Sequence, residues 1–151
     1  MIRIYTDGSS RGNPGPGGYG TILTCQGHYK ELTAGFRLTT NNRMELLAVI
    51  VGLEALKKEG QQVEVYSDSK YVVDAINKGW LVGWLKKGFK GKKNEDLWRR
   101  FWWIFQQHQV TFHWIKGHVG HPENERCDQL AVKSAQKKEL AEDKGYLNNL
   151  T

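Results

Sequence analysis

The chain has 151 residues, of which 39% are hydrophobic and 25% are charged, a composition typical of one globular domain with a substantial core. No apolar run approaches the ~20 residues that a membrane-spanning helix needs, and the first residues lack a signal-peptide pattern, so we expect neither a membrane protein nor a secreted one. Two cysteines are too few for a disulfide framework, so we expect a cytoplasmic protein.

The formal net charge of +6 is concentrated in residues 78–93, which we call the basic segment. It contains six lysines and no acidic residue, which leaves 16 basic residues to balance 16 acidic ones in the rest of the chain. Excess charge confined to one segment favours contact with a polyanion over a generally basic surface.

The first half of the chain is predicted to hold three strands and one helix. A strand over residues 2–7 is followed by a turn-rich loop over residues 8–18, because glycine and proline dominate there. Two more strands, near 19–25 and 29–37, complete an antiparallel meander. An apolar helix follows over residues 43–56. Residues 39–42 offer its N-terminal caps, and Gly60 is its expected C-terminal cap.

The second half alternates strands and helices around the basic segment. The predicted elements are a strand at 63–68, a short helix at 70–77, a helix from a cap at Asn94 to 105, a strand at 110–115 and a helix at roughly 123–138. The polar tail, about 139–151, is expected to be weakly ordered. This order predicts a single α/β domain over residues 1–151, with a mixed five-stranded sheet flanked by helices.

The strands at 2–7 and 63–68 share one pattern of apolar, charged, apolar, Tyr, hydroxyl and Asp. Alternation places each tyrosine on the same face as the aspartate that follows it, Asp7 in one strand and Asp68 in the other. If the strands are neighbours, the two carboxylates are level, which is unfavourable unless a proton or a cation lies between them. The alternative is that each aspartate only ends its strand in a turn.

Two helices add further carboxylates. The helix around Glu45 is apolar on nearly every side, so this carboxylate must be paired, capped or bound to a metal. The alternative is an interaction with the helix dipole or with Arg43. Asp128 lies far enough into its helix to point back at the sheet, and His118 lies in a glycine-flanked loop ten residues earlier.

Four motifs in this order resemble those of the type 1 ribonuclease H family of bacteria, over nearly the whole chain to about residue 146. They are Asp7-Gly8-Ser9 with the run Gly12 to Gly20, Thr40-Asn41-Asn42-Arg43-Met44-Glu45-Leu46, Tyr66-Ser67-Asp68-Ser69, and the run Lys116 to Asp128. Each motif alone is moderate evidence, whereas the four together are very specific. The resemblance implies the ribonuclease H fold.

The resemblance also implies the activity: an endonuclease that hydrolyses the RNA strand of RNA–DNA hybrids, by a two-metal-ion mechanism that leaves 3′-hydroxyl and 5′-phosphate ends. It implies that the catalytic residues are the four metal-binding carboxylates and a mobile loop histidine: Asp7, Glu45, Asp68, Asp128 and His118. Carboxylate oxygen suits two Mg²⁺ ions, or Mn²⁺, and no Cys/His group here has zinc-ligand spacing.

The same resemblance implies contacts to the hybrid. Asn13 approaches the strands on its glycine-rich loop, and Thr40 helps to hold a DNA phosphate. Asn41 and Asn42 reach the minor groove, where 2′-hydroxyls mark the RNA strand. The family usually has glutamine where this chain has Lys70, and a lysine cannot accept a hydrogen bond from a 2′-hydroxyl.

The basic segment resembles the basic protrusion of bacterial members. Its lysines are expected to contact phosphates, with an affinity that falls as salt rises. Its aromatic residues either form a small core of their own or stack on bases. The candidate contacts in this segment are Trp80, Trp84, Lys86, Lys87 and Lys90.

The expected partner is an RNA–DNA hybrid, with no membrane contact, and the protein is expected to be a monomer. Three alternatives stay open: another nuclease or strand-transfer enzyme on the same fold, a non-catalytic hybrid-binding module, and a structural domain. Presence of all four carboxylates argues against the binding module. The position of six lysines beside such a site argues against the structural domain.

Overall fold

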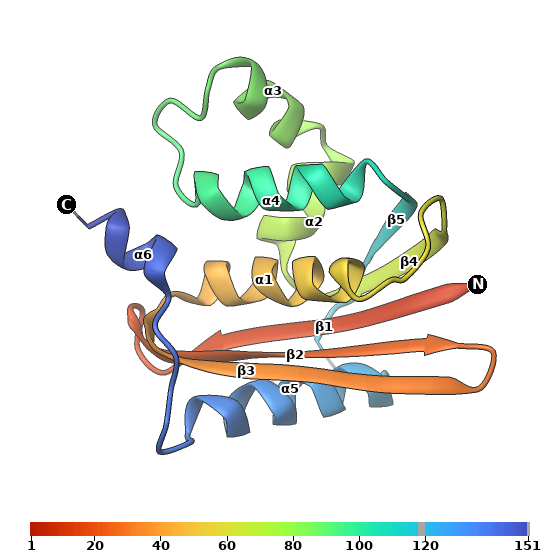
Figure 1. Ribbon diagram of the computed structural model, residues 1–151, viewed down its shortest axis with the longest axis horizontal. Helices are drawn as coiled ribbons and strands as arrows, with labels where there is room; N and C mark the ends of the chain where they lie inside the picture. The colour runs from red at the N-terminus through yellow and green to blue at the C-terminus, as the bar shows by residue number, and fades with distance from the viewer. Residues whose placement is uncertain (118–119, 151) are drawn as a thin grey trace.

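Figure 1 shows the computed structural model, which describes residues 1–117 and 120–150. The described residues form one five-stranded sheet with helices on both faces, so the predicted α/β fold is confirmed. The elements are β1 (Ile2–Ser10), β2 (Gly15–Cys25), β3 (His28–Thr39), α1 (Asn41–Glu54), β4 (Gln62–Ser67), α2 (Lys70–Asn77), α3 (Trp80–Lys86), α4 (Glu95–Phe105), β5 (Gln109–Trp114), α5 (Pro122–Ala135) and α6 (Lys144–Asn148). No helix in the described ranges is long and apolar enough to cross a membrane.

The sheet is mixed, with strand order β3-β2-β1-β4-β5. β1, β2 and β3 form the antiparallel meander, while β4 and β5 are parallel to β1. The predicted neighbours β1 and β4 pair with Tyr5 opposite Tyr66, and their rings stack with centroids 5.2 Å apart. Continuing this register by two residues places Asp7 level with Asp68, as the repeated pattern predicted.

Helices cover both faces of the sheet (Figure 1). On one face α1 packs against β1 and β2, and α4 packs on the outside of α1. On the other face α5 packs against β1, β2 and β3. Figure 1 shows α3 and the chain that leads into α4 standing away from the sheet, so the basic segment projects from the body of the protein.

α1 is the central helix of the core. It is buried on nearly every side, because the sheet covers one face and α4 covers another. Its start is defined by Thr40, whose hydroxyl oxygen accepts a hydrogen bond from the backbone N–H of Arg43 at 3.3 Å. The helix ends at Glu54, so the expected closing role of Gly60 is wrong: that glycine turns the chain toward β4 with φ of 70°.

The loop expected over residues 8–18 is much shorter than the composition indicated. β1 continues to Ser10 and β2 begins at Gly15, with Ser10 paired to Gly17. Gly18 and Gly20 of β2 leave room for α5, which approaches the sheet too closely there for side chains. A Cβ on Gly20 would lie 2.3 Å from the carbonyl oxygen of Cys127 in α5.

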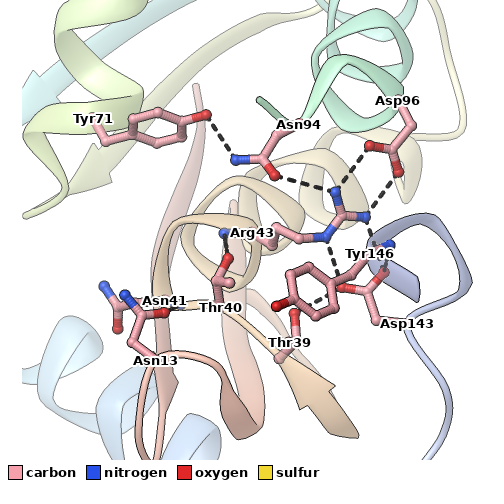
Figure 2. Close-up of polar contacts among 10 residues, drawn as sticks. All are labelled: Asn13, Thr39, Thr40, Asn41, Arg43, Tyr71, Asn94, Asp96, Asp143 and Tyr146. Carbon is pink, nitrogen blue, oxygen red and sulfur yellow. Dashed lines mark hydrogen bonds and ion pairs between the residues drawn. The ribbon is translucent and has the colours of Figure 1, made fainter. Parts of the chain in front are cut away.

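The expected cap of α4 also differs. Asn94 precedes the helix, but its φ is 66° and its side chain makes no capping hydrogen bond. The amide instead donates to the hydroxyl of Tyr71 at 3.0 Å and accepts from Arg43 at 3.3 Å (Figure 2). Asn94 therefore links α2, α1 and the start of α4.

Part of the tail makes contacts that its polar composition did not predict. Ala141 bridges to Phe36 of β3, and α6 follows at Lys144–Asn148. Asp143 is buried and accepts hydrogen bonds from Nε of Arg43 at 2.7 Å and from the hydroxyl of Thr39 at 2.7 Å (Figure 2). These contacts join Ala141 and Asp143 to the body of the protein, because a buried arginine needs its carboxylate, and the expected weak order of the tail as a whole stays a prediction.

Candidate active site

Three of the predicted carboxylates meet at one edge of the sheet. One oxygen from each of Asp7, Glu45 and Asp68 lies within 4.8 Å of the others, and we call these residues the carboxylate cluster. Asp7 lies within β1, Asp68 follows β4, and Glu45 belongs to the first turns of α1. The parallel β1–β4 pair and the helix above it therefore bring together residues that are far apart in the sequence.

Glu45 is held by the strand below it. Oε1 of Glu45 accepts a hydrogen bond from the backbone N–H of Gly8 at 2.5 Å, next to Asp7 in sequence. This contact requires a glycine, because a Cβ at position 8 would lie 2.3 Å from the carbonyl carbon of Met44. The alternative partner Arg43 is wrong for Glu45, since its guanidinium faces Asp96 and Asp143 instead.

Asp128 approaches the cluster from the opposite face of the sheet. It belongs to α5, it is half-buried, and it helps to raise the pKa of Asp7. Gly20 makes this approach possible, because it is paired with Asp7 across β1 and β2 and lies directly under Cys127. The small residue opposite Asp7 thus allows α5 to come close enough for Asp128 to reach it.

Asn124 positions α5 and was missed by the sequence analysis. It is fully buried one turn before Asp128, and its amide donates to the backbone oxygens of Thr6 at 3.3 Å and Tyr66 at 3.2 Å. These oxygens belong to β1 and β4 where their pairing ends. Asn124 therefore joins the two strands that carry Asp7 and Asp68. A buried asparagine has no signature in sequence that separates it from a surface one.

The cluster is electrostatically suited to a divalent cation. Burial raises the pKa of Asp7, and the neighbouring charges of Glu45 and Asp68 raise it further. Burial likewise raises the pKa of Glu45, with repulsion from Asp68 added. Buried carboxylates this close are costly unless positive charge neutralises them, and hard divalent cations prefer such oxygen ligands. The residues present therefore fit a metal site.

The residues predicted to contact the substrate lie together at the start of α1. Asn13, on the loop between β1 and β2, accepts a hydrogen bond from the backbone N–H of Asn41 at 3.1 Å. Asn41 and Asn42 are exposed in the first turn of α1, and Thr40 caps that helix. Figure 2 shows Asn13, Thr40 and Asn41 together, beside the network around Arg43. A hollow of about 250 Å³ adjoins them, lined by Asn13, Pro14, Thr40, Asn42, Lys93, Asn94 and Tyr146.

The basic segment presents its charge to solvent. Lys86, Lys87 and Lys90 are exposed and form no ion pair with any residue in the described ranges. Its two tryptophans differ. The ring of Trp84 packs edge-on against core Trp98 at 5.6 Å, whereas Trp80 is 45% exposed. Trp84 therefore belongs to the small core of the segment, and Trp80 is open to a partner.

Comparisons with known proteins support the family that the four motifs indicated. The profile of the family described as RNase H matches residues 1–136. The ribonuclease H of Desulforamulus reducens is 57% identical over 147 residues, which cover 94% of this chain and 92% of that protein. The ribonuclease H of Lachnoclostridium phytofermentans is 57% identical over 153 residues, covering 94% and 96%.

The chain belongs to the RNase H family. Members of this family are metal-dependent endonucleases that cleave the RNA strand of RNA–DNA hybrids, and the chain has this activity, as its motifs predicted.

Solved structures agree with the fold. LC9-RNase H1, a type 1 RNase H with the type 2 active-site motif, is 32% identical, has a TM-score of 0.77, and covers 89% of this chain and 71% of its own. LC11-RNase H1, solved in complex with an RNA/DNA hybrid, is 30% identical, has a TM-score of 0.65, and covers 89% and 96%. The predicted ribonuclease H fold is therefore confirmed.

His118 lies outside the described residues, so its catalytic role stays a prediction. Asp7, Glu45 and Asp68 form the carboxylate cluster, and Asp128 acts on the pKa of Asp7 from α5, while the catalytic roles of all four stay a prediction.

Proposed function

We propose that the chain cleaves the RNA strand of RNA–DNA hybrids with two Mg²⁺ ions held by Asp7, Glu45, Asp68 and Asp128, and that the products carry 3′-hydroxyl and 5′-phosphate ends. The observation that carries this proposal is the convergence of three carboxylate oxygens within 4.8 Å at the edge of the sheet. Mn²⁺ is expected to replace Mg²⁺, because both accept carboxylate oxygen ligands.

The four carboxylates have different roles in the proposed mechanism. Asp7 is the central residue, flanked by Asp68 from β4, Glu45 from α1 and Asp128 from α5. The four residues would hold the ions: Asp68 is assigned to activation of the attacking water, Glu45 and Asp128 to stabilisation of the leaving group, and Asp7 to both. When bound, such an ion pair activates the attacking water and stabilises the departing oxygen. His118 assists proton transfer or product departure.

The residues at the start of α1 recognise the hybrid. Asn41 and Asn42 are exposed there and reach sugars and base edges in the minor groove, where 2′-hydroxyls distinguish the RNA strand. The hydroxyl of Thr40 uses its oxygen as a cap acceptor, so its hydrogen stays free to donate to a DNA phosphate. The bond from Asn41 to Asn13 fixes the loop against this surface.

The basic segment supplies the longer-range attraction. Its exposed lysines contact phosphates of the hybrid, and exposed Trp80 contacts the strand that passes over α3. Trp84 acts indirectly, because its packing against Trp98 holds α3 on α4. We propose that the protein acts as a monomer in the cytoplasm, where its two free thiols stay reduced.

The test of this function is Asp7→Asn in the full chain, with Asp74→Asn as the matched control. Asp74 lies on α2 in an ion pair with Lys78, away from the cluster. Asp7→Asn should abolish cleavage of a labelled hybrid while hybrid binding persists, and Asp74→Asn should cut like the parent protein. Retained turnover in Asp7→Asn would remove the metal assignment.

A further inference from the structure

Trp114 is the last residue of β5, the edge strand that pairs in parallel with β4. Its indole N–H donates a hydrogen bond to the backbone oxygen of Asp68 at 3.1 Å. Asp68 belongs to the carboxylate cluster and lies just beyond β4, whose pairing with β5 ends at Ser67. A side chain of β5 therefore continues the contact between the strands at the residue that carries the carboxylate.

Both peptide groups that flank the Cα of Asp68 are held. The backbone N–H of Ile115 donates to the carbonyl oxygen of Ser67 at 2.9 Å, which holds the peptide group before Asp68. The peptide group after it is held by the indole bond and by the backbone N–H of Ser69, which donates to Oγ of Ser67 at 3.0 Å. With both peptide planes held, φ and ψ of Asp68 are set, and so is the direction of its side chain.

The indole ring is itself held on one face by Lys70. Lys70 is the exposed first residue of α2, and its ammonium lies 4.8 Å from the centroid of the Trp114 ring. A cation is attracted to an aromatic face, which limits the orientations that the ring adopts. The predicted contact of Lys70 with the hybrid stays a prediction, whereas this contact lies within the protein.

Electrostatic repulsion gives the anchor of Asp68 its importance. The charge of Asp68 raises the pKa of both Asp7 and Glu45, because the three carboxylates lie so close together. On a free turn, the Asp68 carboxylate would move away from these charges when no cation is bound. The hydrogen bond from Trp114 opposes this movement, since the turn can shift only if that bond breaks.

We propose that Trp114 is a positioning residue of the metal site, whose indole N–H holds the turn at Asp68 so that this carboxylate faces Asp7 and Glu45 before a divalent cation binds. This inference rests on the proposed function and deepens it. Groups that orient metal ligands from behind raise the affinity of a site without touching the ion. Trp114 acts in this way through the backbone of Asp68.

Trp114→Phe tests the hydrogen bond, because phenylalanine keeps an aromatic ring and lacks the N–H. Binding of Mn²⁺ to the full chain is measured by calorimetry without hybrid. The net contribution of one hydrogen bond corresponds to roughly a threefold to tenfold change in an equilibrium constant. We expect Trp114→Phe to raise the Kd for Mn²⁺ by about that factor, while the urea midpoint in EDTA stays close to that of the parent protein.

Hydrogen exchange of the metal-free protein measures the order of the turn itself. The backbone N–H of Ser69 should exchange faster in Trp114→Phe, because its peptide group has lost the indole bond. Backbone N–H groups in the paired parts of β1 and β4 should exchange as in the parent protein. Faster exchange throughout β4 with a lower urea midpoint would mean that the ring only stabilises the sheet, and would overturn the inference.

Trp103→Phe is the matched control. Trp103 lies on α4, is 72% exposed, and its indole N–H makes no hydrogen bond with the residues that the structure describes. This change should leave the Mn²⁺ affinity and the exchange at Ser69 as they are. Asp68→Asn removes the carboxylate itself and should weaken Mn²⁺ binding more than Trp114→Phe does.

The outcomes separate this inference from the function on which it rests. Unchanged Mn²⁺ affinity in Trp114→Phe, or unchanged exchange at Ser69, would overturn the positioning role of Trp114. If the parent protein binds no Mn²⁺, or if Asp68→Asn binds it as the parent does, the metal assignment in the proposed function is wrong instead.

Discussion

The backbone N–H of Gly8 and the carboxylate of Glu45 meet in a hydrogen bond of 2.5 Å that joins β1 to α1 beside Asp7. The strand and the helix come this close because Gly8 has no side chain. The same contact fixes two members of the carboxylate cluster relative to each other. Packing and catalysis therefore depend on one backbone position.

Gly8→Ala should damage both stability and activity. The new Cβ would lie 2.3 Å from the carbonyl carbon of Met44 and 2.4 Å from the backbone nitrogen of Glu45, so the helix must move away from the strand. Overpacking of this kind costs about 1–3 kcal/mol. We expect a loss of that size in urea unfolding and a fall in kcat, because Glu45 moves relative to Asp7.

The control for this change is Gly83→Ala in α3. A Cβ at Gly83 meets nothing within 4 Å, and its backbone is helical. Alanine should stabilise the helix by about 0.5–1 kcal/mol and leave kcat unchanged. If Gly8→Ala keeps the stability and kcat of the parent protein, the close contact between β1 and α1 is not required, and this account of Gly8 is wrong.

Asp143→Ala should release the tail and destabilise the whole domain. The change leaves the buried Arg43 with Asp96 as its remaining carboxylate partner among the described residues. Removing one partner of a buried ion pair typically costs about 3–5 kcal/mol, and we expect the lower end because Asp96 remains. Chemical unfolding measures the loss.

Glu142→Ala is the comparison within the same tail. Glu142 pairs with Arg37 at 3.6 Å on the surface, with both side chains more than half exposed. An exposed pair contributes about 0–1 kcal/mol. If Asp143→Ala and Glu142→Ala lower the free energy of unfolding equally, burial of Arg43 does not strengthen its pairing with Asp143.

Asp96 should make stability depend on pH in the acid range. Burial acts to raise its pKa, but the hydrogen bonds and charge of Arg43 outweigh burial, and the pKa lies below its usual value. Folding therefore favours the ionised form. The stabilisation is present above the unfolded-state pKa of about 3.9 and is lost as pH falls through the lower folded-state pKa.

Asp96→Asn tests this sign. Thermal unfolding of the parent protein and of the variant would be compared from about pH 6 downward. We expect the stability difference between them to shrink as the pH falls below about 4, because the parent then loses its ion pair. A difference that stays constant down to about pH 2, well below the unfolded-state pKa, would contradict the account of Asp96.

Replacing Lys86, Lys87 and Lys90 together by Gln should weaken substrate binding more at low salt than at high salt. These lysines are exposed and unpaired among the described residues, so their charge is available to phosphates. KM should rise, and the slope of log KM against log salt should fall by roughly 0.7–0.9 for each phosphate that the variant no longer neutralises.

The control removes the same charge elsewhere. Lys57, Lys58 and Lys137 are exposed outside the basic segment. If their replacement by Gln changes KM and the salt slope as much as the change in the basic segment, the net charge matters and its position does not.

The parts of the site that could be predicted are those governed by local pattern. The period of two along β1 and β4 placed Asp7 and Asp68 on one level, and the structure pairs these strands in that register. Glu45 was recognisable because a carboxylate in an apolar helix needs a partner. Both inferences use residues within a few positions of each other.

The parts that could not be predicted depend on contacts between distant segments. Arg43 and Asp143 are 100 residues apart, and a polar tail has no pattern that reveals a buried partner. The hydrogen bonds from the Asn124 amide to β1 and β4 also have no signature in the sequence. Gly18 of β2 was assigned to a loop, because sequence does not show that α5 occupies the space where its side chain would lie.

The most direct measurement is cleavage of a labelled RNA–DNA hybrid with Mg²⁺, run beside single-stranded RNA, double-stranded RNA, double-stranded DNA and an EDTA control. The account predicts cutting of the RNA strand of the hybrid alone, with 5′-phosphate and 3′-hydroxyl ends, and none in EDTA. Cleavage of DNA, or cleavage that persists in EDTA, would contradict it.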